Sequence, residues 1–149
     1  RYLTYVGVDG MLVSPGYHYE AVSEDHCMAR EEIERKFERV LELSQRYRLY
    51  STPLFLEFAA GKREYPCTPW GNVTRTPKGW KGPCYLIGKT FSPTYQEFWN
   101  GTDWEYWESR QDSRCTNCAM HSGFEASAVR EIRRSPKDLV RTAAWNLLG

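Results

Sequence analysis

The chain has 149 residues, of which 41% are hydrophobic and 15% aromatic. This is enough apolar material for a compact domain with its own core, and it excludes a disordered chain. Twenty Lys and Arg residues against nineteen Asp and Glu residues leave a net charge of +1. That balance gives no reason to expect nucleic acid or an anionic membrane as a partner.

No apolar run approaches the roughly 20 residues that cross a bilayer, and no export leader opens the chain. We therefore expect a cytoplasmic protein without a transmembrane segment. The chain opens at Arg1 and not at Met, so we expect it to be a piece of a longer protein.

The first part of the chain predicts a short strand, a loop and a helix. Residues 11–14 are apolar and strand-like, and Pro15-Gly16 ends the strand. Tyr17-His18-Tyr19-Glu20 then forms a loop, read from its residues alone as a surface turn. Ser23 or Asp25 can cap a helix over about 29–47, where apolar residues recur at helical spacing.

The middle of the chain predicts a buried helix followed by a hairpin. Thr52-Pro53 offers a capping hydroxyl and a first-turn proline, and Gly61 ends this helix. From 65 to 88 the frequent Pro and Gly residues predict short strands and turns, arranged as a hairpin that returns Cys84 to the side of Cys67.

The last third predicts four further helical segments. One opens at Ser92-Pro93 and stops at Asn100-Gly101, and the next is capped by Thr102 or Asp103. After the Cys115-x-x-Cys118 loop, Gly123 precedes a helix near 124–134. Ser135-Pro136 opens a terminal helix, which carries one apolar face formed by Leu139, Val140, Ala143 and Leu147.

Four cysteines have the spacing of a metal site: Cys67, Cys84, Cys115 and Cys118. A C-x-x-C turn points two sulfurs at one place, and a wider pair can complete the set. The fifth cysteine, Cys27, is interpreted as an ordinary small residue. An odd number of cysteines without an export signal disfavours a disulfide framework.

A set of thiolates selects zinc or an iron–sulfur cluster. We favour the cluster because basic residues that could offset its negative charge lie close in sequence: Arg75, Lys78, Lys81, Arg110 and Arg114. Tryptophans nearby could exclude water from it, namely Trp70, Trp80, Trp99, Trp104 and Trp107. Zinc held by the four cysteines, or by Cys115, Cys118, His121 and one other residue, stays open as the alternative.

The first cysteine pair and Gly79 read C-x11-G-x4-C, which resembles the twitch and SPASM extensions of radical SAM enzymes. Further blocks are similar to the C-terminal region of the adenosylhopene transferase family of hopanoid lipid biosynthesis, a region classed as a domain of unknown function. These blocks are Gly7 to Tyr17, Thr52 to Phe58, Cys67 to Asn72, Pro83 to Leu86, Thr102 to Trp104, and Cys115 through Cys118 to Glu125.

This resemblance implies a radical SAM transferase that adds a 5′-deoxyadenosyl radical to a hopene-type lipid. The cysteine set would hold an auxiliary cluster, expected to be [4Fe–4S], and S-adenosylmethionine would bind the protein's own N-terminal radical SAM domain. The C-x3-C-x2-C motif of that chemistry is absent from this chain, so the chain is not expected to be active alone. Peripheral contact with a membrane is compatible with such a substrate, whereas nucleic acid is not an expected partner.

The same resemblance divides the chain into 1–22, the edge of a radical SAM barrel ending in its last strand, and 23–149, the auxiliary-cluster domain. The expected fold class is α+β: the barrel strand, then a small, mostly helical domain with a β-hairpin and a Cys-ligated metal centre. Four residues are expected to line the substrate or cofactor site at the strand end: Ser14, Tyr17, Tyr19 and Glu20. Family members often carry a cysteine where this chain has Ser122, which makes the neighbouring His121 an alternative ligand.

An alternative from another class is a zinc-stapled binding module that presents its tryptophans to a protein partner. Catalytic residues are not identified by the sequence.

Overall fold

The computed structural model describes residues 2–16 and 27–148. They form a small, mostly helical domain with one three-stranded antiparallel sheet. Tyr17, Tyr19 and Glu20, and the expected caps Ser23 and Asp25, lie outside the described residues. None of the described helices is long and apolar enough to cross a membrane.

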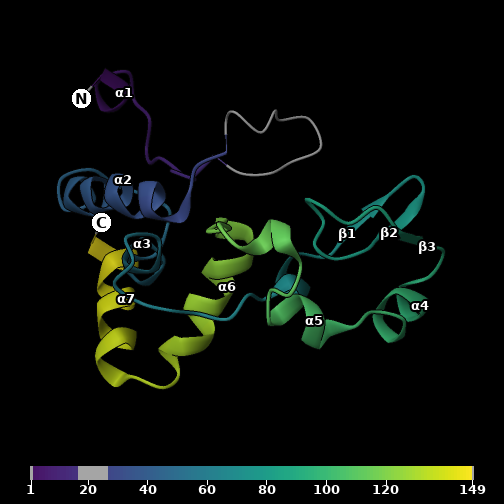
Figure 1. The fold of residues 1–149 in the computed structure, drawn as a ribbon. Helices are drawn as coiled ribbons and strands as arrows, with labels where there is room; N and C mark the ends of the chain where they lie inside the picture. The colour runs from purple at the N-terminus through teal and green to yellow at the C-terminus, as the bar shows by residue number, and fades with distance from the viewer. Residues whose placement is uncertain (1, 17–26, 149) are drawn as a thin grey trace.

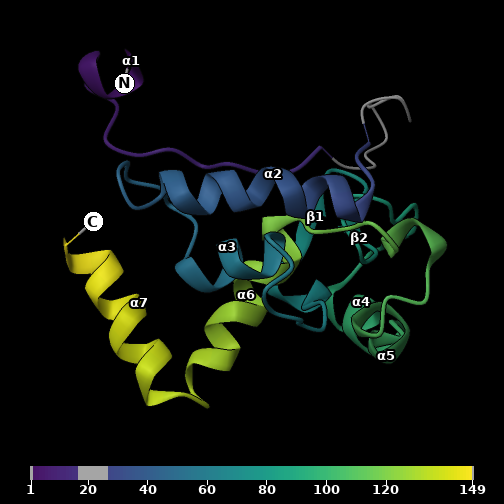
Figure 2. The same ribbon diagram turned by 60° about the vertical axis from the view of Figure 1, so that its left-hand side comes forward.

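The larger part of the domain is a layer of helices (Figure 1). It consists of α2 (Arg30–Leu43), α3 (Pro53–Ala59), α6 (His121–Ile132) and α7 (Pro136–Leu148). Figure 2 shows α2 lying across α3 and α6, with α6 and α7 forming a V. The core lies between α2, α3 and α6, where Phe55, Phe58 and Phe124 are fully buried.

The smaller part carries the sheet and two short helices. Strands β1 (Thr74–Thr76), β2 (Gly79–Lys81) and β3 (Phe91–Ser92) pair in sequence order. Helices α4 (Tyr95–Asn100) and α5 (Trp104–Glu108) follow, and 3-10 turns η2 (Pro69–Asn72) and η3 (Ser113–Cys115) join this part to the helical layer. The short helix α1 (Tyr2–Tyr5) precedes the domain, away from the core.

Several helix starts confirm the predicted caps. Thr52 accepts a hydrogen bond from the Phe55 amide at 3.2 Å, with Pro53 in the first turn. Asp103 caps α5 through the Tyr106 amide, and Ser135 accepts from the Asp138 amide at 3.2 Å. The predicted start of α4 at Ser92 was wrong, because Ser92 belongs to β3 and Thr94 provides the cap.

The expected strand at 11–14 is reduced to a single bridge between Met11 and Leu49. The Met11 amide donates to the Arg48 carbonyl, and the Tyr50 amide donates to the Met11 carbonyl. Met11 and Val13 pack on the core, so the apolar pattern was correctly recognised, but among the described residues no neighbouring strand extends the pairing.

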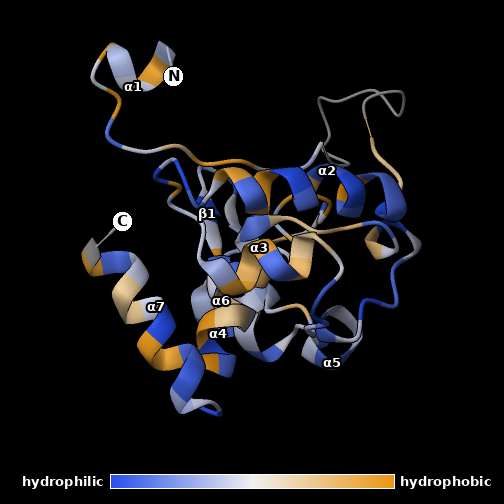
Figure 3. Ribbon diagram, turned by 90° about the vertical axis from the view of Figure 1, so that its left-hand side faces the viewer, coloured by the Kyte–Doolittle hydropathy of each residue, from blue (hydrophilic) through white to orange (hydrophobic). Residues whose placement is uncertain are grey.

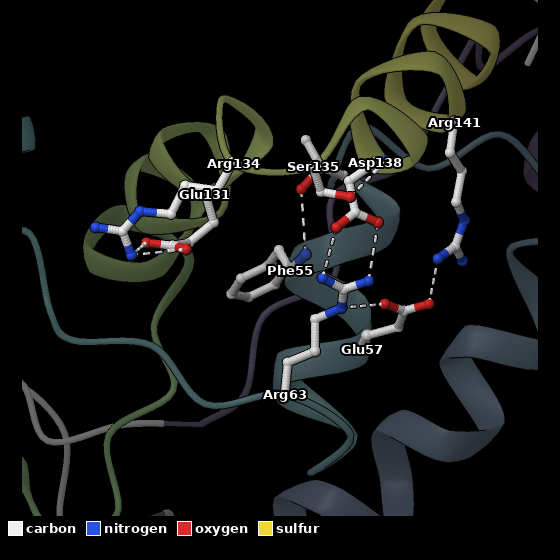
Figure 4. Close-up of polar contacts among 9 residues, drawn as sticks. Phe55, Glu57, Arg63, Glu131, Arg134, Ser135, Asp138 and Arg141 are labelled. Carbon is white, nitrogen blue, oxygen red and sulfur yellow. Dashed lines mark hydrogen bonds and ion pairs between the residues drawn. The ribbon is translucent and has the colours of Figure 1, made fainter.

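An ion-pair network fastens α7 to α3 (Figure 4). Arg63 donates to both carboxylate oxygens of Asp138 at 2.9 Å and to Glu57 at 2.5 Å, and Arg141 also donates to Glu57. Paired with Arg63, the carboxyl of Asp138 has a pKa below its usual range.

Replacing Asp138 by Asn is expected to lower the free energy of unfolding by about 1–2 kcal/mol, because Arg63 loses a bidentate anionic partner. Since the folded pKa of Asp138 is depressed, its contribution is present above the ordinary value of 3.8 and is lost as the pH falls through the folded pKa. Urea unfolding of both proteins from pH 7 to pH 3 measures this. If the difference in the free energy of unfolding between the parent and the Asp138→Asn variant does not shrink toward pH 3, the stabilising role of the Asp138 carboxylate is contradicted.

Candidate metal centre

The four cysteines singled out from the sequence line one cavity. Cys67 precedes η2, Cys84 follows β2, Cys115 ends η3 and Cys118 lies in the loop before α6. The cavity has about 300 Å³ of empty space, which includes space open to solvent. Its other lining residues are Pro69, Trp107, Arg110 and Phe124. The fold therefore gathers thiols from three separate segments.

The hairpin β1–β2 joins the Cys67 and Cys84 segments, as the C-x11-G-x4-C spacing predicts. Thr76 pairs with Gly79 across its turn. Gly79 has φ +121°, and a Cβ there would lie 2.5 Å from the Ser92 carbonyl oxygen. Only glycine fits both the backbone angle and the close approach of β3, which explains the glycine of the motif.

Arg110 organises the C-x-x-C loop. Its guanidinium donates to the backbone carbonyls of Cys115, Thr116 and Cys118 at 2.7, 3.0 and 3.4 Å. It also lies over the Phe124 ring, 5.4 Å from the centroid. The residue adopts φ 60°, an uncommon angle for a side chain other than glycine. Arg110 thus holds both ends of the loop that carries two of the thiols.

Gly123 lets α6 approach Cys67. A Cβ at Gly123 would lie 2.8 Å from the Cys67 sulfur. The Gly123 carbonyl accepts hydrogen bonds from the amide of Thr68 at 3.0 Å and from its hydroxyl at 2.6 Å. The first turn of α6 is therefore fixed against the segment that follows Cys67. From the sequence, Gly123 was predicted to precede this helix. In the structure, Gly123 lies in the first turn of α6.

Asn117, inside the C-x-x-C loop, caps α2. Its side-chain oxygen accepts from the Arg30 amide at 3.3 Å, whereas the N-cap residue, Ala29, forms no side-chain cap hydrogen bond. The loop is consequently tied to the helical layer as well as to the cavity.

Burial raises the pKa of the thiols. It raises that of Cys67 to about 12 and that of Cys115 to about 11, and neighbouring cysteines add to both shifts. Burial also raises the pKa of Cys84, while Lys81 and Arg114 act in the opposite direction. Arg110 lowers the pKa of Cys67 and Cys115, but less than burial raises it. A bound cation would favour the thiolates, because a metal ligates the deprotonated sulfur.

A compact single-ion site is not present among the residues that the structure describes: no three His, Cys, Asp or Glu side chains are gathered in a way that could hold a metal ion. The Cys-ligated metal centre of the expected fold class is thus not shown by the structure. The cysteines share a cavity, and their role as ligands stays a prediction.

Two other predicted site residues are described by the structure, Ser14 and His121, and they contact each other. His121 does not line the cavity, and its Nδ1 lies 3.2 Å from the Ser14 hydroxyl. Ser14 also donates to the Met120 sulfur at 3.4 Å, so this expected substrate-lining residue contacts the chain just after Cys118. Ser122 and Cys27 are not among the lining residues.

Most of the tryptophans that were expected around the metal centre pack elsewhere in the domain. Of the five tryptophans expected to exclude water, Trp107 alone is a lining residue. Trp80, Trp99 and Trp104 pack with one another through Tyr95 and Phe98 in the smaller part of the domain. The indole of Trp70 donates to Glu108 at 2.5 Å. The roles of Gly123 and Asn117 were not foreseen, because each depends on a contact distant in sequence.

The fold and site define a small helical domain with a four-cysteine cavity. The chain belongs to the family described as a domain of unknown function (DUF3463), which it matches over residues 11–142. No curated protein and no solved structure matches the chain.

One nitrogen of Arg110, Nη2, donates to all three carbonyls. Replacing Arg110 by Lys is expected to lower the free energy of unfolding by about 2 kcal/mol, because the lysine side chain is one bond shorter and its ammonium does not reach the position of Nη2. Chemical unfolding of the metal-free protein measures this. Arg75→Ala is the control, since Arg75 is an exposed cation on β1. Equal stability of the Arg110→Lys variant and the parent would mean that charge alone matters.

Gly123→Ala is expected to displace the Cys67 sulfur or α6, because the added Cβ would lie too close to that sulfur. We expect the free energy of unfolding to fall by about 1–3 kcal/mol. Thermal unfolding, together with the rate of alkylation of Cys67 followed by mass spectrometry, measures both effects. Ser122→Ala, a small change at the neighbouring position, is the matched control. Unchanged stability and an unchanged alkylation rate in the Gly123→Ala variant would contradict the close packing.

Proposed function

We propose that this chain is the C-terminal part of a radical SAM enzyme resembling adenosylhopene transferase, and that Cys67, Cys84, Cys115 and Cys118 hold an auxiliary iron–sulfur cluster. The observation that carries the proposal is the single cavity that all four thiols line. The block resemblance to that enzyme family supplies the reaction class, and the match to DUF3463 over most of the chain is compatible with it.

The donor set fits iron and sulfide. Four thiolates without a nitrogen or oxygen ligand are typical of such clusters and of structural zinc. The choice of a cluster over zinc rests on the resemblance to the twitch and SPASM pattern and on the charged and aromatic residues near the thiols.

The residues around the thiols suit a negatively charged cluster. Arg110 lines the cavity, and Lys81 and Arg114 act on the Cys84 thiolate. Trp107 and Phe124 provide apolar walls, and limiting solvent access is one means by which proteins tune such centres. When bound, the cluster supplies electron transfer or a structural link between the hairpin and α6; the present residues serve either role.

The whole enzyme is proposed to be a cytoplasmic transferase that adds a 5′-deoxyadenosyl radical to a hopene-type lipid, with S-adenosylmethionine bound by an N-terminal radical SAM domain. This chain would contribute part of the substrate site through Ser14 and the loop at 17–20. The contact between Ser14 and His121 brings Ser14 to the chain that follows Cys118.

A zinc-stapled binding module is the second candidate. The observation that favours it is the partly exposed aromatic surface of the smaller part, formed by Phe91, Tyr95 and Trp99. Such a surface suits a protein partner.

Iron and acid-labile sulfide, measured on anaerobically prepared protein with an absorption spectrum, test the proposal. We expect both in matching amounts, with a broad absorption in the visible range. Cys67→Ala and Cys118→Ala should lose them, and Cys27→Ala, the matched control outside the cavity, should keep them. Zinc alone after attempted reconstitution, or iron retained without Cys67, would refute the cluster.

A further inference from the structure

Helix α7 places polar residues inward and apolar residues outward. Asp138 and Thr142 are 8% and 7% exposed, whereas Leu139, Val140 and Leu147 are 55%, 68% and 81% exposed. A surface helix ordinarily has the opposite arrangement. Figure 3 shows orange, hydrophobic ribbon along this outlying helix. The apolar face that the sequence predicts therefore exists, but it is turned away from the core.

Two interactions account for this orientation. Asp138 points inward to the bidentate pair with Arg63, and Arg141 reaches Glu57 on α3. Positions 139, 143 and 147 recur every four residues and so share one side of the helix. Isolated exposed apolar residues are ordinary, but a continuous set on one helix indicates a surface that is covered by a partner.

The neighbouring charges are mainly positive. Between Arg130 and the end of the chain there are five cationic and two acidic residues. Glu131 pairs with Arg134, Asp138 with Arg63 and Arg141 with Glu57, which leaves Arg130, Arg133 and Lys137 as the cations outside these pairs. Arg133 and Lys137 are exposed beside the start of α7. The near-neutral charge of the whole chain, which gave no reason to expect an anionic membrane, conceals this local excess.

We propose that the outer face of α7 docks on the surface of a membrane that contains anionic lipids. An apolar helix face flanked by Lys and Arg is typical of helices that lie in the lipid interface. Each cationic side chain near such a surface adds attraction. This docking goes beyond the proposed function and does not depend on a bound cluster. If the proposed function holds, the enzyme would reach its lipid substrate from the membrane on which α7 docks.

Flotation of this chain with lipid vesicles tests the docking. We expect binding to vesicles of phosphatidylcholine with phosphatidylglycerol, weaker binding to phosphatidylcholine alone, and weakening by salt. Leu139→Glu combined with Leu147→Glu should reduce binding about tenfold or more. Lys137→Gln should reduce it about fivefold. Phe91→Glu is the matched control, because β3 and α7 lie at opposite ends of the domain (Figure 1).

Circular dichroism and thermal unfolding establish that the variants are folded. Iron content is measured separately, so that failure of the docking is distinguished from failure of the cluster proposal. Absence of binding to either kind of vesicle would overturn the docking. So would loss of binding in the Phe91→Glu variant with retention in the α7 variant. A dimer in sedimentation that the α7 variant abolishes, without vesicle binding, would assign the face to a second copy of the chain.

Discussion

The packing of the first turn of α6 against the Cys67 segment is the constraint on which the rest of the site depends. The Gly123 carbonyl accepts from both the amide and the hydroxyl of Thr68, and the Ser127 hydroxyl donates to the Pro66 carbonyl at 2.6 Å. Thr68 and Ser127 are almost completely buried. Because buried polar groups are costly to leave unpaired, these bonds fix the position of Cys67 relative to α6 and the loop before it.

The remaining thiols are positioned by contacts that also support the core. Arg110 binds the carbonyls of the C-x-x-C loop while it covers Phe124, whose ring stacks on Phe58 at 4.2 Å. Asn117 of the same loop caps α2. The cavity and the hydrophobic core are therefore built by shared residues, and a change in one is expected to affect the other.

Local signals in the sequence were sufficient for much of this fold. The caps at Thr52, Asp103 and Ser135 depend on neighbouring amides, and the hairpin turn depends on Gly79, so each could be predicted from a few residues. The spacing of the cysteines also predicted that they would meet. Features that depend on distant partners could not be predicted: the cap of α2 comes from Asn117, and α7 is oriented by Arg63.

Iron K-edge X-ray absorption of the reconstituted protein would show whether the four cysteines hold a cluster. We expect an iron environment of sulfur alone with a nearby iron neighbour, lost on removal of Cys67 or Cys118 and kept on removal of Cys27. An environment dominated by oxygen or nitrogen, or one that is unchanged without these cysteines, would contradict the claim that the four-cysteine cavity is a cluster site.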